Sequence, residues 1–268
     1  GNTIANNRQV QLNGNLDLVR LYNLVPLLKK ANDRFNKSTP QKSAKQRQQE
    51  KQKKEAERKR QAEEEKKIRA QATKDGKDAD KAELQRMMGL REEPHVPIVA
   101  IVSRLVSHKG LDLICEVLHD MMELPMQLVI LGKGDRKYEE FFHWAAQQYH
   151  GRMAVRLDYN EELSMAIYAG ADLFLMPSKS EPCGLSQMIA MRYGTVPIVR
   201  ETGGLKDTVQ PHNEFTHDGN GFTFDRYDSG LLLDAINRAK TFYFTNRYCW
   251  DEMVQRDMGK NVSWDCLL

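Results

Sequence analysis

The feature that most constrains the fold is the regular alternation of apolar runs and amphipathic segments that begins at Pro97. The apolar runs cover residues 97–105, 126–132, 153–157, 172–177, 196–200 and 222–224, and their composition suits strands buried on both faces. The segments 111–122, 139–149, 163–171, 185–194, 231–243 and 248–258 carry apolar residues at helical spacing. This alternation predicts an α/β fold, a doubly wound, Rossmann-like parallel sheet with helices on both faces.

The chain before this region has a different composition. Residues 37–80 are rich in Glu, Lys and Arg and have no apolar seam, which predicts a charged helical or disordered insertion. We expect DGKD at 75–78 to interrupt it, and 81–90 to form a short amphipathic helix that ends near Gly89. Residues 1–36, with Pro26 inside an apolar stretch, are interpreted as a fragmentary linker, which leaves 81–268 as the folded domain.

Composition and charge argue against several classes of protein. The net charge is +3 and the basic excess lies mostly in the polar segment, so no nucleic-acid partner is expected. No run approaches the roughly 20 apolar residues that span a bilayer, and the first residues do not resemble a signal peptide. The four cysteines and seven histidines lack metal-ligand spacing. We therefore expect a reduced, cytoplasmic protein with no metal and no membrane partner.

Candidate ligand-binding residues follow the predicted strands, because ligands of such sheets bind at the carboxyl ends of strands. Arg104 and Lys109 place two cations before a helix, where they can face a diphosphate or simply remain solvated. Gly132 in LGKGD allows a ligand close to the backbone, or makes an ordinary turn. Tyr159 can stack on a nucleobase or cover the sheet edge.

The stretch SKSEPCGLS is the most informative of these loops. Glu181 precedes Pro182, Cys183 and Gly184, and a helix is predicted to begin near Leu185 or Ser186. A carboxylate there can accept hydrogen bonds from sugar hydroxyls, while the helix N-terminus offers amides to an anion. The alternative is a surface acid that caps a helix.

The next loop, RETGGLKD, follows the next predicted strand. Thr202, Gly203 and Gly204 make it rich in accessible backbone amides, which are able to bind phosphate. Paired glycines are common in turns and alone do not indicate a binding site. They become evidence for one here because their loop follows the predicted strand next after the Glu181 loop.

Taken together, SRLVSHKGLDL, LVILGKGD, MPSKSEPCGLSQMIAMRYGTVPIVRETGGLKDTV and GNGFTFDRYD resemble, in order and spacing, the C-terminal half of glycogen and starch synthases, over about residues 81–265. The resemblance implies the donor-binding domain of a GT-B fold. It also implies retaining transfer of glucose from ADP-glucose, or else UDP-glucose, to the non-reducing end of an α-1,4-glucan. No cofactor besides this donor is implied.

The same resemblance implies roles for the candidate residues. Arg104 and Lys109 would contact the donor diphosphate and Glu181 the transferred glucose, which makes these three the expected catalytic residues. The expected substrate-binding residues are Cys183, Gly184 and Leu185 around the sugar and phosphate, Tyr159 near the base, Thr202, Gly203 and Gly204 with their amides, and Gly132.

The sequence also departs from the family pattern. Residues 1–80 contain no counterpart of the N-terminal domain that holds the glucan acceptor, and the sequence stops at VSWDCLL. We therefore expect this chain alone to be inactive. A broader retaining hexosyltransferase is one alternative, disfavoured by EPCGL and by Ile189, where related enzymes often carry a second glutamate. A non-catalytic nucleotide-sugar-binding or scaffold module is the other.

Overall fold

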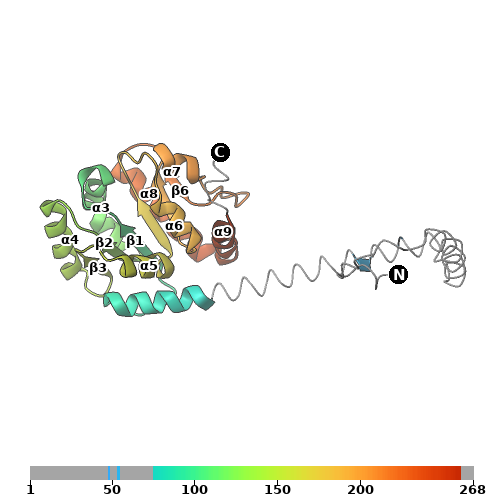
Figure 1. Ribbon diagram of the computed structural model, residues 1–268, viewed down its shortest axis with the longest axis horizontal. Coiled ribbons are helices and arrows are strands. Elements are labelled where there is room, and N and C mark those ends of the chain that lie inside the picture. Colours follow the sequence, from blue (N-terminus) through green and yellow to red (C-terminus); the bar gives the residue numbers. More distant parts are fainter. Residues whose placement is uncertain (1–47, 49–52, 55–74, 261–268) are drawn as a thin grey trace, which may run out of the picture. The chain divides into compact units, whose positions relative to one another are not determined.

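The computed structural model describes residues 48, 53–54 and 75–260 (Figure 1). The chain divides into two units, Gly1–Glu64 and Glu65–Leu268, and the described fold belongs to the second. The expectations for residues 1–36 and for most of 37–74 lie outside the described residues, as does Cys266.

The described domain is built on a six-stranded sheet in which all paired strands run parallel. The strands are β1 (Ile98–Val102), β2 (Gln127–Leu131), β3 (Met153–Arg156), β4 (Leu173–Met176), β5 (Val196–Arg200) and β6 (Phe222–Phe224). Their order across the sheet is β3-β2-β1-β4-β5-β6. The predicted parallel α/β architecture is therefore confirmed, and each predicted apolar run contains one of these strands.

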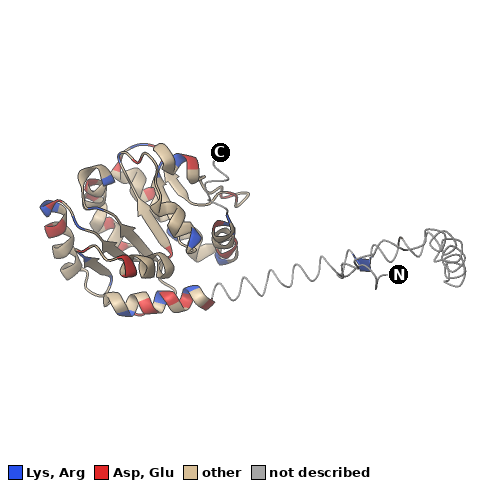
Figure 2. Cartoon of the chain, in the orientation of Figure 1, with Lys and Arg blue, Asp and Glu red and all other residues tan. Residues whose placement is uncertain are grey.

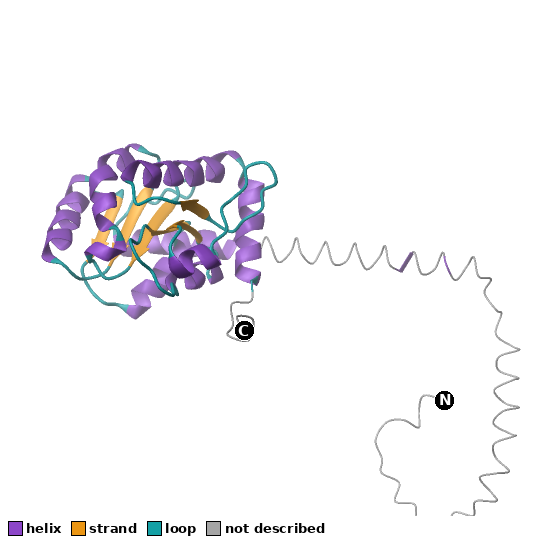
Figure 3. Cartoon of the chain, turned by 90° about the horizontal axis from the view of Figure 1, so that it is seen from above, coloured by secondary structure: helices purple, strands orange, loops and turns teal. Residues whose placement is uncertain are grey.

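Helices cover both faces of this sheet (Figure 3). The core of one face includes residues of α3 (Leu111–Glu123), α4 (Arg136–Gln148), α8 (Ser229–Thr245) and α9 (Arg247–Gly259). The core of the other includes residues of the helix over 75–88, α5 (Glu161–Gly170) and α6 (Ser186–Arg192). The short helices η1 (Ser107–Lys109) and α7 (Gly203–Thr208) lie in loops after β1 and β5, and neither was predicted.

The strands read as continuous apolar runs because each face of the sheet has its own core. Side chains of a strand alternate between faces, and in β1 Val99 and Ile101 enter one core whereas Ile98 and Ala100 enter the other. All four side chains are buried. A strand with water on one face would instead alternate apolar and polar residues.

The strand order creates a topological switch point between β1 and β4. From β1 the chain proceeds through α3 and α4 to β2 and β3 on one side, whereas from β4 it proceeds through α6 to β5 on the other. The two sets of helices lie on opposite faces, as right-handed crossovers require. The loops that leave β1 and β4 therefore diverge at the carboxyl edge, where such sheets bind ligands.

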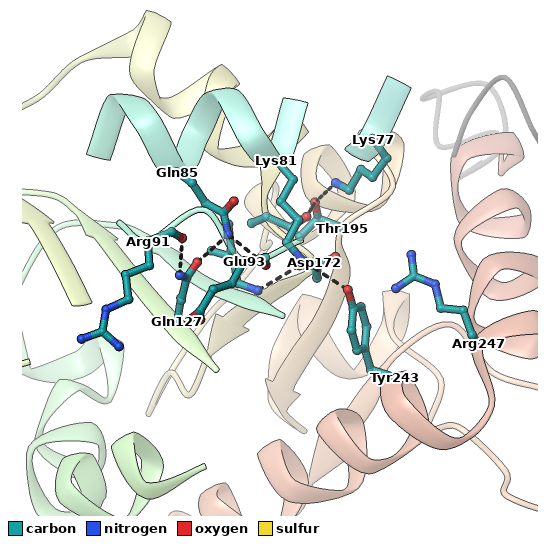
Figure 4. Close-up of polar contacts among 12 residues, drawn as sticks. Lys77, Lys81, Gln85, Arg91, Glu93, Gln127, Asp172, Thr195, Tyr243 and Arg247 are labelled. Carbon is teal, nitrogen blue, oxygen red and sulfur yellow. Dashed lines mark hydrogen bonds and ion pairs between the residues drawn. The ribbon is translucent and has the colours of Figure 1, made fainter. Parts of the chain in front are cut away.

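The helix over residues 75–88 begins earlier than expected, since DGKD at 75–78 is helical and does not interrupt it. Side chains from this helix reach buried polar groups of the sheet layer (Figure 4). Lys81 Nζ lies 2.8 Å from Asp172 Oδ2 and donates to the Tyr243 hydroxyl at 3.1 Å. Lys77 Nζ donates to Thr195 Oγ1 at 2.7 Å. Tertiary anchoring of this kind overrides the weak helix propensity of Asp and Gly.

Charges of both signs are interspersed along the helix over 75–88 (Figure 2). Within residues 75–260 and the three described residues before them, no helix is long and apolar enough to cross a membrane. The same part of the chain contains no cluster of His, Cys, Asp and Glu that could hold a metal ion.

Candidate functional site

An ion pair joins the loops that leave β1 and β4. Lys109, the last residue of η1, places its Nζ 2.5 Å from Oε2 of Glu181. The two side chains are 19% and 13% exposed, so each is largely withdrawn from water but still reachable at the surface. The structure thus brings together two of the residues that the sequence predicted, one from each side of the switch point.

Backbone contacts hold these two loops at a fixed separation. The amide of Lys179 donates to the carbonyl oxygen of His108 at 2.9 Å. Gly110 adopts a φ of +76°, and a Cβ built on it would lie 2.0 Å from the carbonyl oxygen of Pro177. Only glycine meets both the backbone conformation and this close approach. Gly110 therefore allows the loop that carries Lys109 to pack against the loop that carries Glu181.

The loop after β5 packs against the backbone of the Glu181 loop. The amide of Gly204 donates to the carbonyl oxygen of Glu181 at 3.2 Å, and a Cβ on Gly204 would lie 1.7 Å from the carbonyl oxygen of Cys183. This corrects the expectation that the Gly204 amide is available to phosphate, because it is already bonded. Gly203 has a φ of +47°, and a Cβ on it would lie 2.2 Å from the carbonyl oxygen of Glu181. Thr202 is the N-cap residue of α7.

The other cation of the first loop is accessible. Arg104 is exposed and follows β1 by two residues. Gly132 lies beneath this loop: its amide donates to the carbonyl oxygen of Arg156, and a Cβ on it would lie 1.8 Å from the carbonyl oxygen of Ser103. Gly132 was predicted as a residue that lets a ligand approach, whereas here it lets the Arg104 loop approach.

Tyr159 is not brought next to Glu181. It follows β3, the edge strand, and β2 lies between β3 and the switch-point strand β1. Its side chain is 88% exposed. The role near a base that the resemblance implies therefore requires a ligand that extends from the Lys109–Glu181 pair across β2.

The three residues after Pro182 take different positions. Cys183 is exposed, and Leu185, the N-cap residue of α6, is 59% exposed. Gly184 is buried with a φ of +69°, and its carbonyl oxygen accepts a hydrogen bond from Nε2 of Gln187 at 2.6 Å. Gly184 thus shapes the turn, while the side chains of Cys183 and Leu185 are exposed at the surface.

Three residues near the site were not singled out from the sequence. Arg200 ends β5 and donates to the carbonyl oxygens of Ser178 and Lys179. Tyr227 packs under this guanidinium group and donates to Oδ1 of Asp112 at 2.5 Å. Burial and this hydrogen bond raise the pKa of Tyr227, so the hydroxyl keeps its proton. Of these residues, only Arg200 could have been found from the sequence, because it stands at the end of a predicted strand.

This arrangement offers two kinds of chemistry at one edge. A lysine and an exposed arginine can stabilise the negative charge of a diphosphate, and a carboxylate can accept hydrogen bonds from hydroxyl groups. An anionic ligand would compete with Glu181 for Lys109, because the ammonium group is already paired.

Comparison with known proteins identifies the family of the chain. The family model "Glycosyl transferases group 1" matches residues 86–243. The chain is 49% identical over 188 residues to a glycogen synthase of Clostridium acetobutylicum, covering 70% of this chain and 39% of that protein. It is 51% identical over 192 residues to a glycogen synthase of Geobacillus thermodenitrificans, covering 72% of this chain and 39% of that protein.

A solved structure shows the same relationship. The catalytic domain of starch synthase IV from Arabidopsis thaliana, bound to ADP and acarbose, matches with a TM-score of 0.67 and 38% identity. The match covers 71% of this chain and 40% of that one, so the chain spans well under half the length of the relatives it matches. On its sequence, its fold and the family match over most of the folded domain, the chain belongs to the group 1 glycosyltransferases.

Proposed function

We propose that this domain binds the nucleotide-sugar donor of a glycogen or starch synthase reaction, the retaining transfer of glucose to an α-1,4-glucan. The observation that carries the proposal is the Lys109–Glu181 pair at the switch point between β1 and β4. A cation and a carboxylate at this edge suit the two ends of such a donor, its diphosphate and its sugar. The glycogen synthases that the chain resembles support the same reaction.

ADP-glucose is the donor that we propose first, with UDP-glucose as the alternative. The starch synthase with which the fold agrees was solved with ADP. The donor is the only small molecule in this proposal, which includes no metal or other cofactor. A cytoplasmic location fits the three free cysteines of the described region.

We also propose that glucan elongation requires a second domain. The Lys109–Glu181 pair lies at the carboxyl edge of the sheet, and Leu185 in the Glu181 loop and Tyr159 after β3 are exposed, which suits one wall of a cleft. Transferases need the acceptor held against the donor and water kept away. The second domain would form the opposite side of the cleft and bind the acceptor.

Calorimetric titration of the chain with ADP-glucose and UDP-glucose tests donor binding directly. We expect saturable binding of ADP-glucose, with weaker binding of UDP-glucose. A folded sample that binds neither nucleotide sugar would refute the proposed function. The reverse preference would retain donor binding and correct the identity of the base.

Two alanine variants separate the assigned roles. Lys109→Ala is expected to weaken binding of both ADP and ADP-glucose, because both carry the diphosphate. Glu181→Ala is expected to weaken binding of ADP-glucose but not of ADP, because only the former carries the sugar. Equal losses in the two variants would show that the roles are wrongly assigned. Arg136→Ala, in an exposed pair with Glu140 on α4, is the control for loss of a charge.

Elongation tests the need for a second domain. The chain is incubated with ADP-glucose and a malto-oligosaccharide, with and without the separately expressed N-terminal half of a glycogen synthase relative. We expect longer glucans only in the mixture. Turnover by the chain alone would contradict the proposal that elongation requires a second domain.

A further inference from the structure

Arg200 is a residue to which neither the sequence nor the family match assigned a role. We propose that it is the positioning residue for Glu181: it fixes the segment 178–181, and so selects nucleotide sugars over the free nucleoside diphosphate. This inference rests on the proposed function for its ligand, but its structural part stands on contacts within the chain.

The first contact is a fork of hydrogen bonds to successive carbonyl groups. Nε of Arg200 donates to the carbonyl oxygen of Ser178 at 2.8 Å, and Nη2 donates to that of Lys179 at 2.6 Å. A planar guanidinium group makes two directed bonds of this kind at once, whereas the single ammonium group of a lysine does not reproduce the fork. Charged donors also make stronger bonds than neutral ones.

The segment held by this fork leads directly to the carboxylate. Ser178 is buried, and its Oγ lies 3.3 Å from Oε2 of Glu181, the same oxygen that pairs with Lys109. The carbonyl oxygen of Glu181 in turn accepts from the amide of Gly204. Both ends of the segment 178–181 are therefore tied to the end of β5 and the loop that follows it.

Arg200 is itself held in place by groups from two other parts of the domain. Its guanidinium carbon lies 5.9 Å from the centre of the Tyr227 ring, within the range of a cation–π interaction. The Tyr227 hydroxyl donates to Asp112 in the first turn of α3. A rigid support of this kind is what a positioning residue needs, because a small displacement of a binding group costs much affinity.

Arg200 would act through Glu181 without touching the donor. Two of its three guanidinium nitrogens are committed to the carbonyl oxygens of Ser178 and Lys179, and Nη1 lies 3.5 Å from the carbonyl oxygen of Asp225. A diphosphate contact by Arg200 would have to break this set. Its loss should therefore affect recognition of the sugar much more than recognition of the diphosphate.

The test compares Arg200→Lys and Arg200→Gln with the parent chain, using ADP and ADP-glucose in calorimetric titrations. We expect ADP-glucose affinity to fall about 10-fold, the size of a lost charged hydrogen bond, while ADP affinity changes less than about twofold. Arg238→Lys is the matched control: Arg238 also donates to a main-chain carbonyl, that of Thr223, but does not contact the Glu181 loop. Equal losses for ADP and ADP-glucose would overturn the positioning role.

Hydrogen exchange provides a readout that needs no ligand. Peptides that cover residues 178–184 should exchange faster in both Arg200 variants, while peptides from β2 and α4 keep the rate of the parent chain. Unchanged exchange at 178–184 overturns the proposal. If the parent chain binds neither ligand, the proposed function fails, and with it the selection role; the exchange still decides whether Arg200 orders the segment. Arg200→Lys, the milder change, covers the case in which Arg200→Gln does not fold.

Discussion

Nζ of Lys109 lies 2.5 Å from Oε2 of Glu181, so the cation and the carboxylate neutralise each other across the switch point of the sheet. A diphosphate that binds Lys109 must displace or share this pair. The ion pair therefore opposes diphosphate binding, unless the sugar of the same ligand bonds the carboxylate at the same time.

Glu181→Gln removes the charge of this carboxylate and nearly preserves its volume. Because Lys109 is then free, we expect ADP to bind about fivefold more tightly, which corresponds to about 1 kcal/mol for a partly exposed ion pair. ADP-glucose should bind no more tightly than to the parent chain, since its hydroxyls lose a charged acceptor. Titrations at two salt concentrations measure both. Weaker ADP binding in Glu181→Gln than in Glu140→Gln, an exposed control on α4, would contradict the competition.

Gly204→Ala tests the contact between the β5 loop and the Glu181 loop. The added Cβ would lie 1.7 Å from the carbonyl oxygen of Cys183, so the loops must separate. We expect a loss of about 1–3 kcal/mol in the free energy of unfolding, together with weaker binding of ADP-glucose. Gly76→Ala is the matched control, because nothing lies within 4 Å of its added Cβ. In a helix this change should stabilise by about 0.5–1 kcal/mol. Equal effects of the two substitutions in denaturant unfolding would refute the argument.

Lys81→Met tests the anchor of the helix over 75–88. Lys81 and Asp172 are both buried, so removal of the lysine leaves a carboxylate whose remaining bond is to the amide of Ile98. We expect a loss of about 3–5 kcal/mol, typical of a broken buried pair. Lys81→Met combined with Asp172→Asn should recover much of this, because asparagine is neutral and still accepts from Ile98. A double variant no more stable than Lys81→Met, in urea unfolding, would disprove the ion-pair explanation.

Asp257 makes stability depend on pH in a predictable direction. Burial raises its pKa to about 8, from an ordinary value of 3.8. Between these values the folded protein holds a proton that the unfolded chain has released, so this group's contribution to stability falls as pH rises from about 4 to about 8. The slope is at most about 1.4 kcal/mol per pH unit.

Asp257→Asn should remove this slope, since an amide does not ionise. The variant should gain stability relative to the parent chain as pH rises from 5 to 8, measured by denaturant unfolding at both values. Asp234→Asn, in an exposed pair on α8, is the control and should follow the parent chain. A constant difference between Asp257→Asn and the parent at pH 5 and pH 8 would contradict the raised pKa.

The strands could be predicted because the sheet is covered on both faces. A strand in such a sheet consists of consecutive apolar residues, as in Ile98–Val102, and this run is visible in the sequence. Besides the three-residue η1, the helix α7 was missed and the start of the helix over 75–88 was misjudged, because local propensity is a weak guide there. α7 contains two glycines in six residues, and DGKD contains two aspartates and a glycine. In both cases contacts with distant residues decide the conformation: Gly204 with Glu181, and Lys77 with Thr195.

The sequence by itself determined the α/β class, the six strands, and the loops that carry Lys109 and Glu181. Only the tertiary structure decided that β4 lies beside β1, that these two side chains form an ion pair, and that Arg200 supports the segment between Ser178 and Glu181. The physical reason is the separation along the chain of the residues that interact. A strand or helix is encoded in neighbouring residues, whereas strand order and loop contacts depend on packing between residues far apart in the chain.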